Sequence, residues 1–355
     1  MSVRGDFLQP GKRIYIYIMT PAKQKTNYPF LQNLTERIVS GGAATRRDAE
    51  KIVSLHDQND IVMLAAHANV LRNHFTGSCI KLCAIVNAKS GRCSEDCIFC
   101  AQSTHYSTDV KTYPLLSAED VVAGAQAART EGAGHFSIVT SGKGIASAGE
   151  IITLCDYVKA IALLEPLIPC ASLGVLSRQE LLMLREAGLR RYHHNLETSR
   201  SHFSAICSTH SYEERVQTIR MAQEAGLEVC AGGILGMGET PQQLIELAFT
   251  LKELNVESVP LNFLNPIAGT PAARYGLLQP LEILKSISLF RFVLPDKEIR
   301  ICGGRETGLR TLQPLMYIAG ASGTMIGNYL TTSGRDPAVD VQEIHDLALT
   351  IGRMP

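Results

Sequence analysis

Three cysteines within eight residues are the strongest chemical signal in this sequence. Cys93, Cys97 and Cys100 give the spacing C-x3-C-x2-C. A loop this short can turn three thiolates toward one point, and three ligands leave one iron of a [4Fe–4S] cube without a protein ligand. A small chelating molecule can bind at such an open position, as at a catalytic zinc. The spacing therefore predicts a catalytic iron–sulfur cluster.

A structural zinc ion is the alternative for this loop. It needs a fourth cysteine or histidine, and His105 lies five residues after Cys100. Disulfide bonds are the alternative for the cysteines as a whole, but no export signal is visible, so metal ligation is favoured. Cys79, Cys155 and Cys207 are interpreted as structural. The chain has ten cysteines, at positions 79, 83, 93, 97, 100, 155, 170, 207, 230 and 302.

The composition excludes several classes of function. The 355 residues carry a net charge of zero, and no Lys/Arg stripe is present, so we expect no nucleic-acid partner. The apolar run at residues 14–19 is far shorter than the roughly 18 residues of a membrane span and has no signal-peptide cleavage pattern. We therefore expect no membrane partner and a cytoplasmic location.

From about residue 80, short β-rich runs alternate with amphipathic helical stretches. Eight strands alternating with helices predict a parallel sheet closed as a (β/α)8 TIM-type barrel, with an open doubly wound sheet as the alternative. Active sites of such barrels lie at the C-terminal ends of the strands. The predicted strands are residues 82–87, 135–140, 168–173, 191–197, 228–233, 258–263, 298–302 and 323–327. The predicted helices are residues 117–131, 150–164, 178–187, 212–225, 241–254 and 280–293.

The chain divides into three parts. Residues 1–30 have mixed charge and no periodicity, which predicts a disordered N-terminal tail, and Met19 offers a second plausible start. Residues 31–76 show helical spacing and are expected to form N-terminal helices that pack on the barrel. Residues 77–350 are expected to be the barrel itself.

Several stretches resemble the biotin synthase family of radical S-adenosylmethionine (SAM) enzymes. The segment from residue 87 to residue 103 is similar to the family's cluster loop and contains the superfamily signature C-x3-C-x-aromatic-C. Residues 192–199, 232–240, 259–262 and 300–306 are also similar to family segments. The resemblance spans about residues 45–350.

The resemblance implies a SAM site beside the three-cysteine loop. The methionine part of SAM would chelate the vacant iron, Phe99 would contact the adenine, and one electron would cleave SAM to a 5′-deoxyadenosyl radical. Asn195 and Glu197 share one face of a predicted strand and would contact the ribose. A glycine-rich turn would let the backbone approach SAM closely; this group of cofactor-binding residues is Gly232, Gly233, Gly236 and Glu239.

The resemblance also implies a substrate, dethiobiotin. Asn262, a polar residue in an apolar strand, would bind its ureido ring. His193 stands where the family usually has another substrate-binding asparagine, and a histidine can still hydrogen-bond a ureido group.

Family members hold a second, auxiliary cluster that supplies the inserted sulfur, a [2Fe–2S] cluster in the best-known ones. Cys170, Cys230 and Arg300 match three of its ligands, but Ser137 stands at the fourth position. Cys83 and Cys302 are additional, and the predicted strands that carry these cysteines are alternate strands of the barrel, which contribute side chains to one interior layer. We therefore expect an auxiliary cluster of the four-iron type on Cys83, Cys170, Cys230 and Cys302. Ordinary buried cysteines at positions 83 and 302 are the alternative.

The implied activity is sulfur insertion into dethiobiotin, the last step of biotin formation. The implied partners are SAM, dethiobiotin, a low-potential electron donor of the flavodoxin or ferredoxin type, and a second copy in a homodimer. A related radical SAM maturase or mutase on the same barrel is one alternative. A non-catalytic iron–sulfur or zinc protein is the other.

Overall fold

The computed structural model describes residues 27–352. The predicted tail up to residue 26, including the second possible start at Met19, lies outside these residues. Helix α1 begins at Tyr28, so the last three residues assigned to the tail belong to the first helix.

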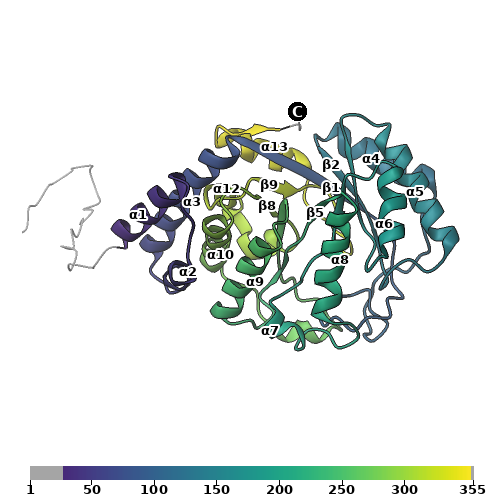
Figure 1. The fold of residues 1–355 in the computed structure, drawn as a ribbon, viewed down its shortest axis with the longest axis horizontal. Helices are drawn as coiled ribbons and strands as arrows, with labels where there is room; N and C mark the ends of the chain where they lie inside the picture. Colours follow the sequence, from purple (N-terminus) through teal and green to yellow (C-terminus); the bar gives the residue numbers. More distant parts are fainter. Residues whose placement is uncertain (1–26, 353–355) are drawn as a thin grey trace, which may run out of the picture.

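A closed parallel barrel forms the centre of the molecule (Figure 1). Each strand pairs in parallel with its neighbour, and the last barrel strand pairs back with the first, Lys81 opposite Gly323, so the open doubly wound sheet is excluded. The strands are β1 (Cys79–Lys89), β2 (His135–Thr140), β3 (Ile168–Ser172), β4 (Arg191–His193), β5 (Glu228–Cys230), β6 (Gly233–Leu235), β7 (Ser258–Phe263), β8 (Glu298–Ile301), β9 (Gly323–Met325) and β10 (Thr350–Ile351).

The predicted eight-stranded pattern is confirmed, with two corrections. The predicted strand 228–233 is interrupted and forms β5 and β6, both of which pair with β7. The predicted strand 191–197 ends at His193, and the chain continues to an isolated bridge between Glu197 and Gly233. Both corrections lie on the side of the barrel where the candidate SAM residues are found.

Helices surround the barrel. The longer helix α13, short α7, α11 and α12 and two 3-10 turns were not predicted. The helices are α1 (Tyr28–Val39), α2 (Arg46–Val53), α3 (Gln58–Thr76), α4 (Ala118–Thr130), α5 (Ala148–Ala162), α6 (Arg178–Glu186), α7 (Arg200–Phe203), α8 (Tyr212–Glu224), α9 (Pro241–Glu253), α10 (Pro280–Val293), α11 (Arg305–Leu309), α12 (Leu315–Ile318) and α13 (Pro337–Asp346); the 3-10 turns are η1 (Pro271–Arg274) and η2 (Arg310–Leu312).

Polar caps set where the barrel helices begin. The Oγ of Ser117 accepts a hydrogen bond from the Asp120 N–H at 3.1 Å, as its position before α4 predicts. Ser177, Ser211 and Thr240 form capping boxes at α6, α8 and α9. These caps satisfy backbone N–H groups that would otherwise have no partner, and so define the loops that precede these helices.

The N-terminal helices lie together at one end of the molecule, beside α10 and α12 (Figure 1). Their buried faces, which include Leu31, Leu34 and Ile38 of α1, belong to the same continuous hydrophobic core as the barrel. These helices therefore share one hydrophobic core with the barrel.

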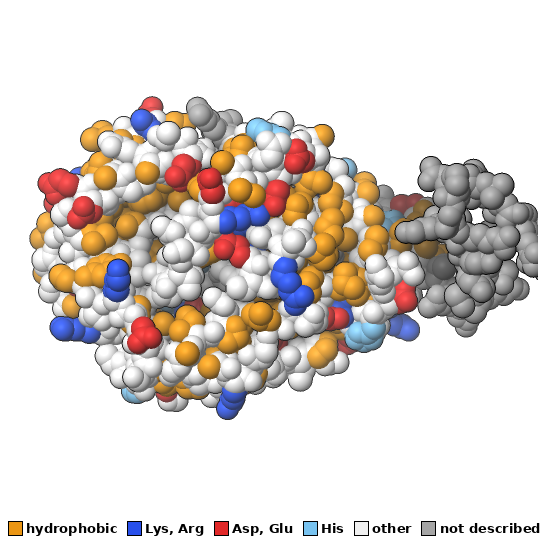
Figure 2. Space-filling view, turned by 180° about the vertical axis from the view of Figure 1, so that it is seen from behind, with side chains coloured by type: hydrophobic (Ala, Val, Ile, Leu, Met, Phe, Trp, Pro, Cys, Tyr) orange, Lys and Arg blue, Asp and Glu red, His pale blue; other side chains and the backbone are white. Residues whose placement is uncertain are grey.

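The surface shows acidic and basic side chains interspersed. On the face in Figure 2, Lys/Arg and Asp/Glu groups are scattered among apolar side chains. Within residues 27–352, no helix has the length and apolar character of a membrane-spanning segment.

Candidate active site

One cavity of about 360 Å³ runs from the C-terminal ends of the strands into the barrel. Most of the side chains predicted from the sequence to do chemistry line it. They are Cys83, Phe99, Cys100, Cys170, His193, Asn195, Glu197, Cys230, Asn262, Arg300 and Cys302. The two predicted cluster sites therefore open into the same space, one near the mouth and one deep inside.

The three-cysteine loop follows β1 and is folded onto itself. The Cys93 N–H donates to the Gln102 carbonyl at 2.9 Å, and the Thr104 N–H donates to the Cys93 carbonyl at 2.8 Å. Cys93 and Cys97 are buried, whereas Cys100 lines the cavity. Backbone hydrogen bonds thus hold this loop in shape.

His105 lies on the cluster loop, with its Nε2 2.9 Å from the Ser94 carbonyl oxygen. Among the described residues, the ligand atoms that gather beside Cys97 are those of Cys207 and His210, and His105 is not part of this group.

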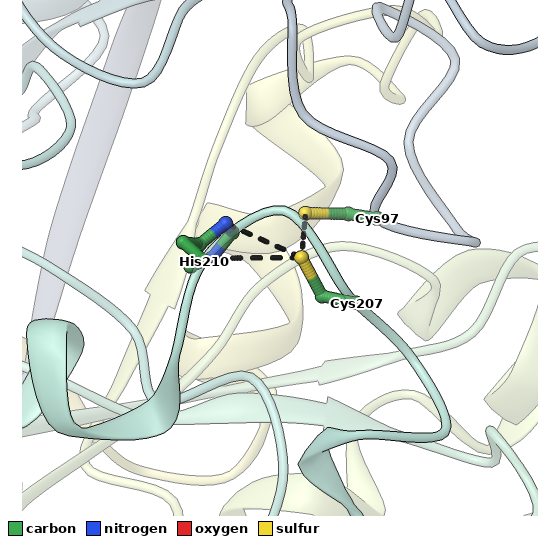
Figure 3. A group of neighbouring side chains, drawn as sticks. All are labelled: Cys97, Cys207 and His210. Atoms are coloured by element: carbon green, nitrogen blue, oxygen red, sulfur yellow. Dashed lines mark hydrogen bonds between the residues drawn. The ribbon is translucent and has the colours of Figure 1, made fainter.

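Cys207 lies beside the cluster loop. Its Sγ is 3.8 Å from the Sγ of Cys97 and 3.2 Å from Nδ1 of His210 (Figure 3). The interpretation of Cys207 as merely structural is therefore incomplete, because this thiol contacts a predicted cluster ligand. The sequence signal that could have found it is the C-x2-H spacing of Cys207 and His210.

A chain of polar contacts connects this thiol to the candidate SAM residues. Nδ1 of His210 lies 2.6 Å from Oε2 of Glu95, and Arg215 donates from Nε to Nε2 of His210 at 3.0 Å. Because Nε2 accepts a hydrogen bond, the ring proton of a neutral His210 lies on Nδ1. Arg215 also lies 3.6 Å from the carboxylate of Glu197. The cluster loop and the Glu197 region are thus parts of one network.

Asn195 and Glu197 lie in the loop after β4. The Oδ1 of Asn195 accepts from the Gly232 N–H at 3.1 Å, and its Nδ2 donates to Oε2 of Glu197 at 3.3 Å. Glu197 has a φ of 66°, a left-handed conformation that non-glycine residues rarely adopt. The two side chains come together through this turn, whereas the sequence predicted that they share a strand face.

The glycines after β5 make room for the chain's own backbone. A Cβ on Gly232 would lie 1.9 Å from the Pro260 carbonyl oxygen, and one on Gly233 would lie 2.5 Å from the Glu197 carbonyl oxygen. Glu239 accepts hydrogen bonds from the backbone N–H groups of Gly236, at 2.6 Å, and Met237. The described residues that line the cavity do not include Gly232, Gly233, Gly236 and Glu239.

The candidate substrate residues line the middle of the cavity. Asn262 is held in place because its Oδ1 accepts from the Gly303 N–H at 2.9 Å and its Nδ2 donates to the Gly233 carbonyl at 3.3 Å. Burial lowers the pKa of His193, so its ring is neutral near pH 7 and can both donate and accept a hydrogen bond.

Four cysteines and one arginine line the deep part of the cavity, as predicted. Cys83, Cys170 and Cys230 come from β1, β3 and β5, and Arg300 and Cys302 from β8 and the residue after it. Interaction between the Cys83 and Cys302 thiols lowers the pKa of Cys83 and raises that of Cys302. Burial raises the pKa of Cys170 to about 12. Cys170 and Cys302 must therefore release protons when they bind a metal.

The same chamber contains buried polar atoms without partners. They are both ring nitrogens of His135, the Oγ of Ser137 and the Nε of Arg300. A buried polar atom without a hydrogen bond costs about 1–3 kcal/mol, so native proteins rarely leave several together. A polar guest such as an iron–sulfur cluster fits this donor set, and the residues present suit the auxiliary group.

A second cavity of about 400 Å³ lies at the other end of the barrel and is lined by charged side chains, among them Lys81, Glu228 and Glu298. Arg191 lines both cavities, with Nη2 2.8 Å from Glu228 and Nη1 3.3 Å from Glu298. This layer of ion pairs is the floor of the chamber. Cys79 lines the lower cavity and not the chamber, which agrees with its exclusion from the cluster ligands.

A closed parallel barrel with a C-x3-C-x2-C loop after its first strand defines a radical SAM enzyme. Residues 88–251 match the model of the Radical SAM superfamily, and residues 260–350 match the Biotin and Thiamin Synthesis associated domain. The chain is 50% identical to the biotin synthase of Geobacter sulfurreducens over 325 residues, which cover 92% of this chain and 98% of the relative. It is 49% identical to the biotin synthase of Heliobacterium modesticaldum, over 90% of this chain and 98% of the relative. The chain belongs to the biotin synthase family.

Solved structures support the fold. Methylornithine synthase aligns with a TM-score of 0.80 at 19% identity over 90% of this chain and 97% of that one. The [FeFe]-hydrogenase maturase of Carboxydothermus hydrogenoformans aligns with a TM-score of 0.77 at 16% identity, over 92% of this chain and 80% of that one. At these identities the likeness concerns the barrel and not the reaction.

Proposed function

We propose that this chain inserts sulfur into dethiobiotin, using SAM bound at a cluster on Cys93, Cys97 and Cys100 and sulfur from an auxiliary cluster deeper in the barrel. The observation that supports this most is the single cavity that Cys100 and the four deep cysteines share. A radical formed near the mouth and a sulfide held on the floor can then reach one substrate molecule between them. A maturase or mutase that consumes no sulfide would have no need of the deep thiols.

When bound, SAM supplies a carbon-centred radical that removes hydrogen from carbons without acidic protons. The chain's residues therefore have to position the reactants and exclude water, and general acid–base chemistry would not help. Asn262, with both of its amide atoms anchored to the backbone, presents a rigid contact to the ureido ring of dethiobiotin. His193 offers a second hydrogen bond from β4. Such fixed contacts keep the two reacting carbons between the radical and the sulfide.

On the SAM side, Phe99 would contact the adenine and Glu197 the ribose hydroxyls. Arg215 supports this assignment because it lies beside the Glu197 carboxylate and donates from Nη1 to the Asn195 carbonyl at 2.9 Å. Gly232, Gly233, Gly236 and Glu239 would act indirectly, by fixing the wall against which SAM lies.

The auxiliary cluster is proposed to be of the four-iron type on Cys83, Cys170, Cys230 and Cys302, with Arg300 beside it. The lining of the chamber supports this, because the two cysteines that best-known members lack, Cys83 and Cys302, line it together with Cys170 and Cys230. Ser137, a weaker iron ligand than a thiolate, lines the same chamber.

The remaining assignments follow from the reaction. A low-potential donor of the flavodoxin or ferredoxin type has to supply the electron, and such donors work in the reducing cytoplasm. We also propose a homodimer, and a division into N-terminal helices at residues 31–76 and a catalytic barrel at residues 77–350.

The test is transfer of labelled sulfide. The protein is reconstituted without air with ³⁴S-sulfide, freed of excess sulfide, and mixed with SAM, dethiobiotin and a low-potential reductant. We expect biotin that carries ³⁴S, in an amount no larger than the auxiliary cluster. SAM cleavage without sulfur-containing product would favour the maturase or mutase alternative.

Cys302→Ala is the matched variant. We expect it to keep the catalytic cluster and SAM cleavage but to hold less iron and form little biotin. An unchanged iron count and yield would remove Cys302 from the auxiliary cluster. Cys155→Ala, in α5 outside the cavity, is the control and should behave as wild type.

A further inference from the structure

His135 is a buried histidine for which the protein provides no hydrogen-bond partner. Its side chain lines the chamber, it is 3% exposed, and both ring nitrogens lack a partner. A structural histidine in a core normally donates from one nitrogen and accepts at the other. Leaving both nitrogens unpaired costs free energy, so this position suggests a ligand that is not part of the chain.

The position of His135 in the sheet places it among the cysteines of the chamber. It is the first residue of β2 and faces the same side as Ser137, two residues further, and both line the cavity. In the parallel register, His135 is opposite Cys83 of β1, and Ser137 is opposite Cys170 of β3. His135 thus lies one step deeper along β2 than Ser137, with Cys83 on the neighbouring strand.

Two arginines, Arg191 and Arg300, line the chamber together with His135 and favour an anionic occupant, such as a cluster of iron, sulfide and thiolates. A neutral imidazole has one free lone pair, and imidazole nitrogen is a good ligand for iron. Strand β2 therefore has a ligand to offer even though Ser137 stands at the position of the familiar cysteine.

We propose that His135 binds iron of the auxiliary cluster through a ring nitrogen, as the ligand contributed by β2. This inference rests on the proposed function, because it requires an auxiliary cluster in the chamber. It adds one nitrogen donor to the set formed by Cys83, Cys170, Cys230 and Cys302.

The test looks for a histidine nitrogen on the cluster. The holoprotein is prepared with ¹⁵N-histidine and unlabelled SAM, the auxiliary cluster is reduced, and pulsed electron paramagnetic resonance is recorded. We expect ¹⁵N coupling in wild type and its loss in His135→Leu. His193→Asn is the matched control, because His193 also lines the chamber, and it should keep the coupling.

Iron retention gives a second readout. We expect His135→Leu to lose auxiliary iron to a chelator roughly tenfold faster than wild type, and the added change Ser137→Cys to slow this loss again by restoring a ligand on β2. Catalytic-cluster SAM cleavage and the thermal unfolding midpoint show that the variant is folded.

The results distinguish a failure of the role proposed for His135 from a failure of the proposed function. A reduced auxiliary cluster without ¹⁵N coupling, or with coupling that survives in His135→Leu, overturns the role of His135 and leaves the proposed function standing. A wild-type protein that takes up only the iron of the catalytic cluster overturns both.

Discussion

At the scale of single residues, Cys207 is a neighbour of the predicted cluster ligand Cys97. Its thiol lies 3.8 Å from the Cys97 sulfur, although the two residues are 110 positions apart. In the structure Cys97 donates to Cys207, and the Cys207 thiol donates to Oδ1 of Asp96 at 3.2 Å. When Cys97 ligates iron as a thiolate it can only accept, so a hydrogen bond between the two sulfurs then requires the Cys207 thiol to turn its proton toward Cys97. Hydrogen bonds to ligand sulfurs raise the reduction potential of a cluster because they stabilise the more negative reduced state.

We therefore expect Cys207→Ala to lower the potential of the catalytic cluster by roughly tens of millivolts. A redox titration followed by electron paramagnetic resonance measures this, with Cys155→Ala as the control. An unchanged potential in Cys207→Ala would show that the thiol is only a packing neighbour.

The residues that were predicted are identified by spacing along the chain, whereas those that were missed are brought together only by the fold. Cys93, Cys97 and Cys100 were recognisable because their spacing along the chain already brings them together. Cys207 and His135 were missed because their roles depend on which strands and loops lie next to one another. Gly232 and Gly233 were expected to make room for a ligand, but the atoms that need the room belong to Pro260 and Glu197, which no local pattern reveals.

At the scale of elements, the alternation of strands and helices was predictable because each element has its own periodicity and caps. The strands β2 and β7 and the helix α10 have the predicted bounds. The break between β5 and β6 was not predicted, because a run of apolar residues and glycines predicts one continuous strand. The break occurs where Gly232 passes close to the Pro260 backbone, a constraint set by the neighbouring strand β7.

Gly232→Ala tests this constraint. A Cβ at 1.9 Å from a backbone oxygen forces β5 and β7 apart, so we expect a loss of about 3 kcal/mol in the free energy of unfolding. Gly276→Ala is the control, since a Cβ there meets no atom within 4 Å and should change stability little. Urea denaturation of both variants distinguishes a local clash from a general intolerance of alanine.

At the scale of the whole molecule, a buried ion cluster fastens the C-terminal helix to the barrel. Arg305 of α11 donates to Asp340 of α13 at 2.8 Å and to the Met325 carbonyl of β9 at 3.2 Å, and Asp340 is fully buried. Arg335 pairs with the same carboxylate. The C-terminal segment is thereby held against the strand ends near the cavity.

Removing this carboxylate should be costly. We expect Asp340→Ala to lower the free energy of unfolding by about 3–5 kcal/mol, because it leaves two arginines without their shared partner, one of them buried. Asp346→Ala, on an exposed position of the same helix, should have a far smaller effect. Equal losses in the two variants in chemical denaturation would contradict the structural role given to the cluster.

The charged residues at the floor of the chamber make the stability of the protein depend on what the chamber holds. Arg191 and Arg300 line the chamber itself, whereas their carboxylate partners Glu228 and Glu298 line the lower cavity. An anionic occupant of the chamber is attracted by both guanidinium groups and, by binding only the native state, adds to its stability. A protein molecule whose auxiliary cluster has given up its sulfide would therefore be less stable than one whose cluster is intact. Such a molecule would be more susceptible to proteolysis until its auxiliary cluster is rebuilt.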